Sequence, residues 1–227
     1  MDATRRSLRA DPGHAGQAAA RGDSAAPGIA AVRARVASLF DRVGLGDARV
    51  AVALSGGRDS MALLDAALAG GTDGAIAAIH VHHGLSPNAD AWADFCVDQC
   101  RRRGVTCKVR HVSVVAAPRR SLEADACEQR RTALTEAAGA LGAAAVLLAH
   151  HADDQAETLL LQLLRGAGPR GLAAMAEARN ASGLWWLRPF LDLPRTAIDD
   201  YVRARAIAYI EDESNASARH WRNALRH

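Results

Sequence analysis

The chain has 227 residues, 49% of them hydrophobic and 23% charged, and its formal net charge at neutral pH is +3. This is enough for one substantial core with appendages, and so mild a charge does not by itself indicate a nucleic-acid partner. No segment approaches the ~20 apolar residues of a membrane span, and no apolar run follows the first charges as it would in a secretory signal. With four cysteines and no CxxC pair, a disulfide framework is not expected, so we predict a cytoplasmic protein without a membrane partner.

A polar leader precedes a regular alternation of apolar and amphipathic segments. Residues 1–28 are rich in Ala, Gly, Arg and Asp and show no hydrophobic period, so we predict that this leader is disordered. Short apolar runs typical of buried strands follow at Arg49–Leu54, Ala75–His82, Thr106–Val112 and Ala144–Ala149. Helices are predicted at Ile29–Val43, Ser60–Leu68, Asp90–Arg103, Leu122–Leu141 and Asp153–Leu164.

The alternation is weaker after Gly166. A strand at Leu184–Leu187, a helix at Pro194–Ala206 and a last strand at Tyr209–Glu211 are predicted there. Strands that alternate with helices indicate βαβ units, so we expect an α/β, doubly wound domain with a mostly parallel five-stranded sheet and helices on both faces. Residues 29–227 would form this domain, and residues 166–227 a small extension that covers the cleft at the carboxyl ends of the strands.

A glycine-rich hexapeptide directly follows the first predicted strand and leads into a helix. Glycines let backbone N–H groups approach a ligand closely, and the helix N-terminus adds unpaired N–H donors at its positive dipole end. Two serine hydroxyls add further donors, so we predict a phosphate-binding loop. Its residues are Ser55, Gly56, Gly57, Arg58, Asp59 and Ser60.

An acidic residue distinguishes this loop from the two best-known phosphate loops. The Walker A motif requires GxxxxGK followed by Ser or Thr, the dinucleotide fingerprint requires GxGxxG, and neither occurs here. A carboxylate beside phosphate is repulsive unless a cation lies between them, and Mg²⁺ commonly bridges such groups. We therefore predict that Asp59 contacts Mg²⁺ and takes part in catalysis. The alternative is that Asp59 only caps the helix that follows.

A second polar motif lies at the end of the fourth predicted strand and runs into a helix. Residues 150–158 read HHADDQAET and contain three carboxylates. Asp154 and Glu157 are three positions apart, so they can face the same way. We predict that both take part in catalysis at a site for a cation, either Mg²⁺ or a substrate ammonium group. The alternative is that these acids only complement the helix dipole.

These motifs resemble those of a known enzyme family. The hexapeptide SGGRDS is similar to the phosphate loop of the PP-loop ATP pyrophosphatases. Within that superfamily, residues 150–172 and the HVHHGL sequence at residues 80–85 resemble segments of the tRNA(Ile)-lysidine synthases. A third stretch, which runs from RPFL at Arg188 to RNALR at residues 222–226, is similar to a further block of the same family. The blocks occur in the family's order over most of the chain.

The resemblance implies a ligase that uses ATP and Mg²⁺ and acts on isoleucine tRNA with a CAU anticodon and on free L-lysine. In this family the C2 oxygen of the wobble cytidine attacks the α-phosphate of ATP and pyrophosphate leaves. The lysine ε-amine then attacks C2 and displaces AMP. The resemblance also implies substrate contacts at His83, Arg130, Arg165, Arg222 and Asn223.

The sequence departs from the family pattern at two places. In the helix after the third strand, Arg130 matches, but Cys127 stands where an arginine is usual and Arg131 where a tyrosine is usual. The chain also ends at His227, whereas many members of the family continue, so further C-terminal domains are not expected in it. The sequence leaves open whether the protein assembles as a homodimer.

Other functions are left open as well. A sister PP-loop enzyme, either a tRNA cytidine thiolase or an amide synthase, would share the phosphate loop, although such thiolases generally need paired cysteines. A truncated relative that binds nucleotide without catalysis would fit Cys127 and the short chain. A metal-dependent phosphohydrolase would use the histidines at residues 80–83 and 150–151 as ligands, but it would leave the phosphate loop unexplained.

Overall fold

The computed structural model describes residues 27–70, 76–84, 86–112, 122–164, 166, 168 and 174–211. The predicted leader up to residue 26 and the predicted contacts Arg165, Arg222 and Asn223 lie outside these residues. The helices are α1 (Pro27–Val43), α2 (Arg58–Ala69), α3 (Ala89–Arg102), α4 (Leu122–Leu141), α5 (Ala152–Leu164) and α6 (Arg195–Ala204). The strands are β1 (Val50–Ala53), β2 (Ile76–His82), β3 (Thr106–His111), β4 (Ala145–Leu147), β5 (Ala178–Ala181) and β6 (Leu184–Leu187).

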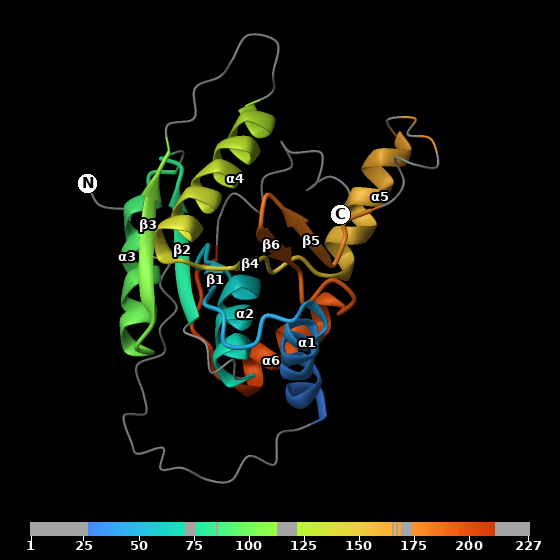
Figure 1. Cartoon of the computed structure of the whole chain (residues 1–227), viewed down its shortest axis with the longest axis horizontal. Helices are drawn as coiled ribbons and strands as arrows, with labels where there is room; N and C mark the ends of the chain where they lie inside the picture. Colours follow the sequence, from blue (N-terminus) through green and yellow to red (C-terminus); the bar gives the residue numbers. More distant parts are fainter. Residues whose placement is uncertain are drawn as a thin grey trace, which may run out of the picture.

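The strands form one sheet in the order β3-β2-β1-β4-β6-β5 (Figure 1). The pairings between β3, β2, β1, β4 and β6 are all parallel, and β5 pairs antiparallel with β6. The expectation of an α/β domain with a mostly parallel sheet is therefore confirmed. The strand order reverses direction at β1, with β2 on one side and β4 on the other, and this is the place where ligands bind in open α/β sheets.

The predicted count of five strands is wrong, because the described sheet has six. The strand that the prediction missed is β5, whose sequence Ala-Arg-Asn-Ala has no alternation of apolar and polar residues. It is held by its hairpin with β6, whose turn residues Ser182 and Gly183 both have positive φ, as a type I′ turn requires. The strand predicted at Tyr209–Glu211 is also wrong, because that segment makes only a single bridge, between Ile210 and Gly57.

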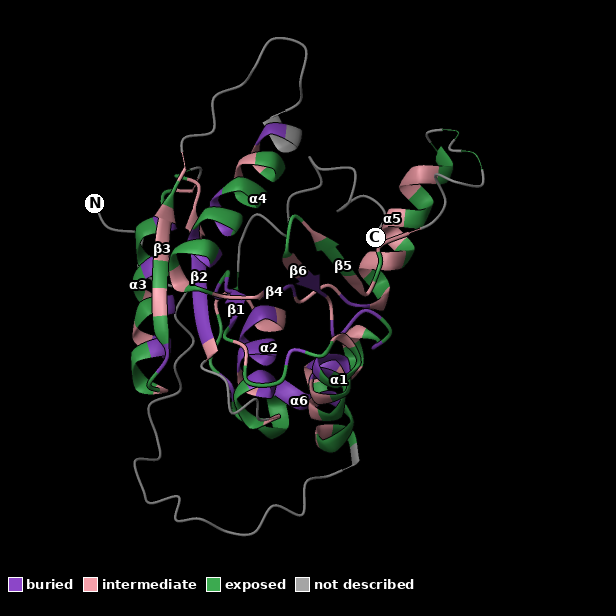
Figure 2. Cartoon of the chain, viewed as in Figure 1, coloured by how far each residue is buried: buried purple, intermediate pink, exposed green. Residues whose placement is uncertain are grey.

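Helices pack on both faces of the sheet, as expected. Val50 and Val52 of β1 face a core shared with α1, α2, α3 and α6, while Ala51 and Ala53 face a second core shared with α4. This division follows from the alternation of side chains along a strand, since successive residues point to opposite faces. The central strands are therefore buried on both sides (Figure 2) and hold the carboxyl end of β1 in a fixed position.

Helix α5 differs from the other helices in its packing. It projects from the body of the molecule (Figure 1), and none of its residues is buried. Leu160, Leu163 and Leu164 are 45%, 50% and 71% exposed. Across the described residues, no helix combines the length and the apolar character that a membrane crossing would need.

Candidate functional site

The predicted phosphate loop connects the carboxyl end of β1 to the N-terminus of α2. Helix α2 begins at Arg58, two residues earlier than predicted, and its N-cap is Gly57, which has no side chain to occupy the N–H groups of the first turn. Ser55 and Ser60 close the loop on itself: the Ser60 hydroxyl donates to the Gly57 carbonyl at 2.9 Å, and the two hydroxyl oxygens lie 3.0 Å apart. The loop therefore presents a preformed helix N-terminus, which favours an anion.

Only glycine fits at position 56. Gly56 has a φ of +85°, a conformation that residues with a Cβ rarely adopt. A Cβ there would lie 2.7 Å from Cδ1 of Ile210 and 3.1 Å from the Cys96 sulfur. The glycine thus allows the loop to turn while residues from α3 and from the segment after α6 pack directly behind it.

Asp59 is the second residue of α2 and not its N-cap, so the alternative that it only caps the helix is wrong. One carboxylate oxygen of Asp59 accepts from Nε of Arg58 at 3.4 Å, and the other lies 3.8 Å from Nε2 of His151. The Arg58 guanidinium is turned away toward α6, where Nη1 lies 2.6 Å from a carboxylate oxygen of Asp199. The side chain predicted to bind nucleotide is therefore paired with two carboxylates.

The second acidic motif meets the phosphate loop at His151. Strands β1 and β4 are parallel neighbours, so their carboxyl ends lie side by side. His151, which is buried, precedes α5, and its backbone N–H donates to a carboxylate oxygen of Asp154 at 3.0 Å. The same oxygen lies 3.6 Å from Nε2 of His151. Asp154 therefore does stabilise the start of α5, as the alternative interpretation supposed, and it also faces the side of the site where Asp59 lies.

The other acids of this motif have separate surroundings. Asp153 accepts from the backbone N–H of Arg195 at 3.4 Å, so it contributes to the start of α6. Glu157 lies about one turn beyond Asp154 on α5 and is half-buried.

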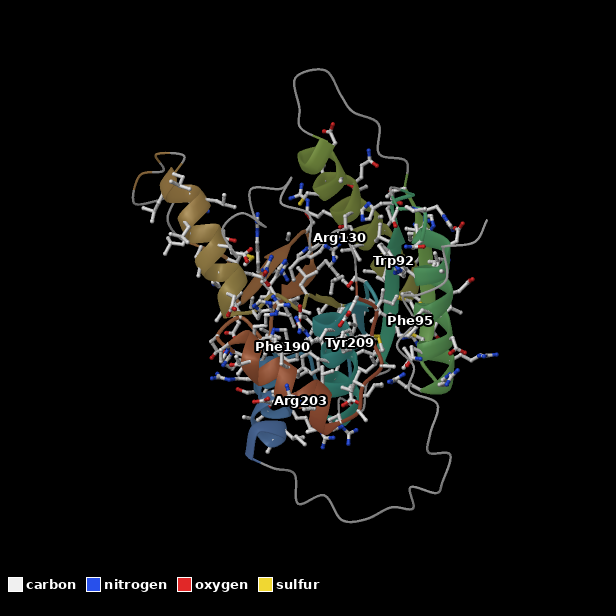
Figure 3. All side chains as sticks on the ribbon, turned by 180° about the vertical axis from the view of Figure 1, so that it is seen from behind. Trp92, Phe95, Arg130, Phe190, Arg203 and Tyr209 are labelled. Carbon is white, nitrogen blue, oxygen red and sulfur yellow. The ribbon has the colours of Figure 1, made fainter. Side chains whose placement is uncertain are left out.

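Basic side chains lie at the carboxyl end of β2 and near it. Nδ1 of His80 donates to the Leu54 carbonyl at 2.9 Å, and burial lowers the pKa of His80 below its ordinary value of 6.5. Burial also lowers the pKa of His83, and the nearby Arg130 guanidinium lowers it further. Arg130 lies on α4 near the middle of the molecule (Figure 3) and is exposed to solvent. His83 and Arg130, predicted from separate motifs, thus lie within electrostatic range of each other.

Asp59 and Asp154 are the carboxylates near the loop that could ligate a cation. Within the described ranges, no group of three or more His, Cys, Asp or Glu side chains is arranged to hold a metal ion. Mg²⁺ needs only one or two protein carboxylates, because substrate phosphates and water supply its other ligands. Asp59 and Asp154 both have an oxygen within 4 Å of the same histidine nitrogen, so they converge close to the N-terminus of α2.

Two residues of this region were missed by the sequence analysis. Asp199 and Ile210 contact the phosphate loop from the far end of the described chain, and no local pattern around them indicates this contact. His151, in contrast, belongs to a motif that the sequence analysis had already identified.

The chain is similar to known proteins over most of its length. Residues 30–227 match the family model described as the PP-loop domain. A tRNA(Ile)-lysidine synthase of Ralstonia nicotianae is 50% identical over 181 residues, which cover 78% of this chain and 39% of that protein. The enzyme of the same name from Chromobacterium violaceum is 47% identical over 180 residues, which cover 78% of this chain and 40% of that protein. The chain thus spans about two fifths of the length of these curated relatives.

A solved structure supports the fold independently. The U34-tRNA thiolase NcsA from Methanococcus maripaludis, determined with its 4Fe-4S cluster, superposes with a TM-score of 0.73 over 87% of this chain and 71% of that chain. The two sequences are 17% identical, so this likeness concerns the fold alone.

Proposed function

The chain belongs to the PP-loop domain family, and from this premise we propose that it is the ATP-dependent catalytic domain of a tRNA(Ile)-lysidine synthase. The proposed reaction joins L-lysine to C2 of the wobble cytidine in isoleucine tRNA. The observation that supports this proposal best is the convergence of Asp59 and Asp154 beside the uncapped N-terminus of α2. The identity to the named synthases agrees with it.

In the first step, the C2 oxygen of cytidine would attack the α-phosphorus of ATP, and the bond to the bridging oxygen of pyrophosphate would break. The first N–H groups of α2, together with the exposed Ser55 hydroxyl, would hold the departing pyrophosphate through hydrogen bonds and the helix dipole. Ser60, whose hydroxyl donates to the Gly57 carbonyl, would hold the loop in shape. Mg²⁺, when bound by Asp59, would offset the charge of the phosphates. Adenylation converts a poor leaving oxygen on C2 into a good one.

In the second step, the ε-amine of lysine would attack C2, and AMP would leave with the former C2 oxygen. Lysine arrives as an ammonium ion, so it must be held by negative charge and must lose a proton before it attacks. Asp154 and Glu157, one turn apart on α5, would orient this group and accept its proton. His83 and Arg130, on the opposite wall, would face the tRNA, with Arg165, Arg222 and Asn223 as further predicted contacts.

We further propose that residues 29–227 form a single catalytic domain, that residues 166–227 extend it over the cleft, and that the protein acts in the cytoplasm. Assembly as a homodimer remains a prediction.

The test is pyrophosphate release from ATP in the presence of lysine and isoleucine tRNA with a CAU anticodon. The control substrate is the same tRNA with a changed wobble base. We expect release only with the cytidine-bearing tRNA, and we expect it to be lost in Asp59→Asn but kept in Asp200→Asn, whose carboxylate pairs with Arg203 on the surface of α6. Equal release with both tRNAs would contradict the proposed substrate.

A further inference from the structure

The segment from α6 to Ile210 contacts the phosphate loop and the helix that follows it at three places. We call residues 195–210 the brace. In the sequence the brace follows the loop by more than half the length of the chain, yet it packs against α2 in the same core. A Cβ on the loop residue Gly56 would meet both Ile210 of the brace and Phe95 of α3, so the brace and α3 both lie against the loop there.

The first contact is the ion pair between Arg58 and Asp199. Nη1 of Arg58 lies 2.6 Å from Asp199, and both side chains are largely shielded from solvent, with 21% and 30% of their surfaces exposed. Nε of the same guanidinium lies 3.4 Å from Asp59. Arg58 is therefore shared between two carboxylates, and Asp199 has the closer contact.

The second contact is two turns further along α2, where Asp65 accepts from the Tyr201 hydroxyl at 2.6 Å and from Nε of Arg205 at 3.2 Å. Burial and the bond to Asp65 raise the pKa of Tyr201 to about 12, so this hydroxyl stays protonated and donates. Along α2 the cation Arg58 precedes the anion Asp65. Along the brace the order of charges is the opposite, since Asp199 precedes Arg205. A reversed brace would bring like charges together, so this pairing fixes its direction.

The third contact is made by backbone atoms. The N–H of Ile210 donates to the Gly56 carbonyl at 2.9 Å, and Ile210 forms a parallel bridge with Gly57. Because the peptide group is planar and trans, holding this carbonyl on one side directs the Gly57 N–H to the other. The brace therefore prevents the peptide between Gly56 and Gly57 from turning its oxygen toward a bound anion.

We propose that Asp199 is a positioning residue for Mg²⁺–ATP: it holds Arg58 toward α6 and thereby leaves the Asp59 carboxylate available to the metal. This inference rests on the proposed nucleotide site. Without the charge of Asp199, Arg58 moves onto Asp59, which it already contacts, and neutralises the carboxylate that the metal needs. This effect on the metal requirement for ATP binding is distinct from any change in the stability of the fold.

The experiment measures ATP affinity at a series of Mg²⁺ concentrations, by calorimetry on the whole chain, together with a thermal unfolding curve for each variant. In Asp199→Asn we expect the Mg²⁺ concentration for half-maximal ATP binding to rise by ~3- to 10-fold, the range of a perturbed charge contact. Asp199→Glu should restore much of the wild-type requirement. The double variant Arg58→Met/Asp199→Asn should also recover, because no cation is left to occupy Asp59.

Two control variants separate positioning from structural support. Asp200→Asn changes the neighbouring, exposed carboxylate and should leave the metal requirement unchanged. Tyr201→Phe removes the second contact and should lower the melting temperature without raising the metal requirement. Arg58→Met alone removes the cation that competes for Asp59, so it should not raise the Mg²⁺ concentration for half-maximal ATP binding. Its ATP affinity at saturating Mg²⁺ is a separate readout, because Arg58 belongs to the phosphate loop.

The possible results are distinguishable. A wild-type chain that does not bind ATP would overturn the proposed function, and this inference with it. A wild-type chain that binds ATP, with the same metal requirement in Asp199→Asn, would overturn the inference alone. A double variant that is as impaired as Asp199→Asn would also overturn it, because the defect would then not depend on Arg58.

Discussion

At the scale of single residues, the tightest steric requirement in the site is at Gly56. Replacing it with alanine adds a Cβ at a φ of +85° and within 2.7 Å of Ile210. We expect Gly56→Ala to lower the free energy of unfolding by about 2–5 kcal/mol, from backbone strain and overpacking together. Urea denaturation measures this loss.

Gly44 provides the matched control for this substitution. It also has a positive φ, of +66°, but a Cβ there would meet no atom within 4 Å. Gly44→Ala should therefore cost only the backbone strain of about 1–2 kcal/mol. Equal losses in the two variants would show that contact with Ile210 contributes nothing.

His80 makes stability depend on pH. Its pKa is lowered by burial, so the folded protein binds fewer protons at this site than the unfolded chain does. The contribution of His80 to the free energy of unfolding should therefore be constant above pH 6.5. It should fall as the pH drops from 6.5 toward the lowered pKa. The pKa of His83 is also lowered, so His83 should likewise reduce the free energy of unfolding as the pH falls.

The variant His80→Asn keeps a donor for the Leu54 carbonyl and cannot be protonated. We expect a shallower loss of stability between pH 7.5 and pH 5 in this variant than in the wild type, measured by denaturant titration at each pH. Identical pH profiles would contradict the assignment to His80.

At the scale of elements, α5 contributes catalytic candidates at its start but little packing along the rest of its length. Leu164 is 71% exposed, whereas Leu63 of α2 is fully buried. We expect Leu164→Glu to change the free energy of unfolding by less than about 0.5 kcal/mol, and Leu63→Ala to lower it by about 2–5 kcal/mol. Chemical denaturation of both variants under one set of conditions tests the contrast.

The sequence predicts most of this fold, because the core strands and helices carry their own hydrophobic period. Strand β5 was missed because its residues have no apolar pattern of their own. They form a strand because they pair with β6. The phosphate loop and the motif at residues 150–158 could be recognised because each places its chemistry in consecutive positions. Asp199 and Ile210 could not, because only the packing of the brace brings them to the loop.

At the scale of the whole molecule, ligand binding should stabilise the fold. A ligand that binds only the folded state adds ~2.7 kcal/mol of stability at a concentration 100 times its dissociation constant. We expect Mg²⁺–ATP to raise the melting temperature of the wild type, and Asp59→Asn to abolish most of this rise while keeping its own melting temperature without nucleotide close to that of the wild type. Differential scanning calorimetry measures both; a full rise in Asp59→Asn would exclude Asp59 from the nucleotide site.

The brace also has a consequence for how the protein is made. Ribosomes produce the chain from its N-terminus, so Gly56 emerges long before Ile210, its hydrogen-bond partner. Contacts between residues so distant in sequence form late and slow the search for the native state. In a nascent chain the phosphate loop would therefore be complete in sequence before the brace has left the ribosome. Until then the loop would lack its contacts with the brace. ATP would accordingly begin to bind only after the brace has emerged, and not when the loop itself has emerged.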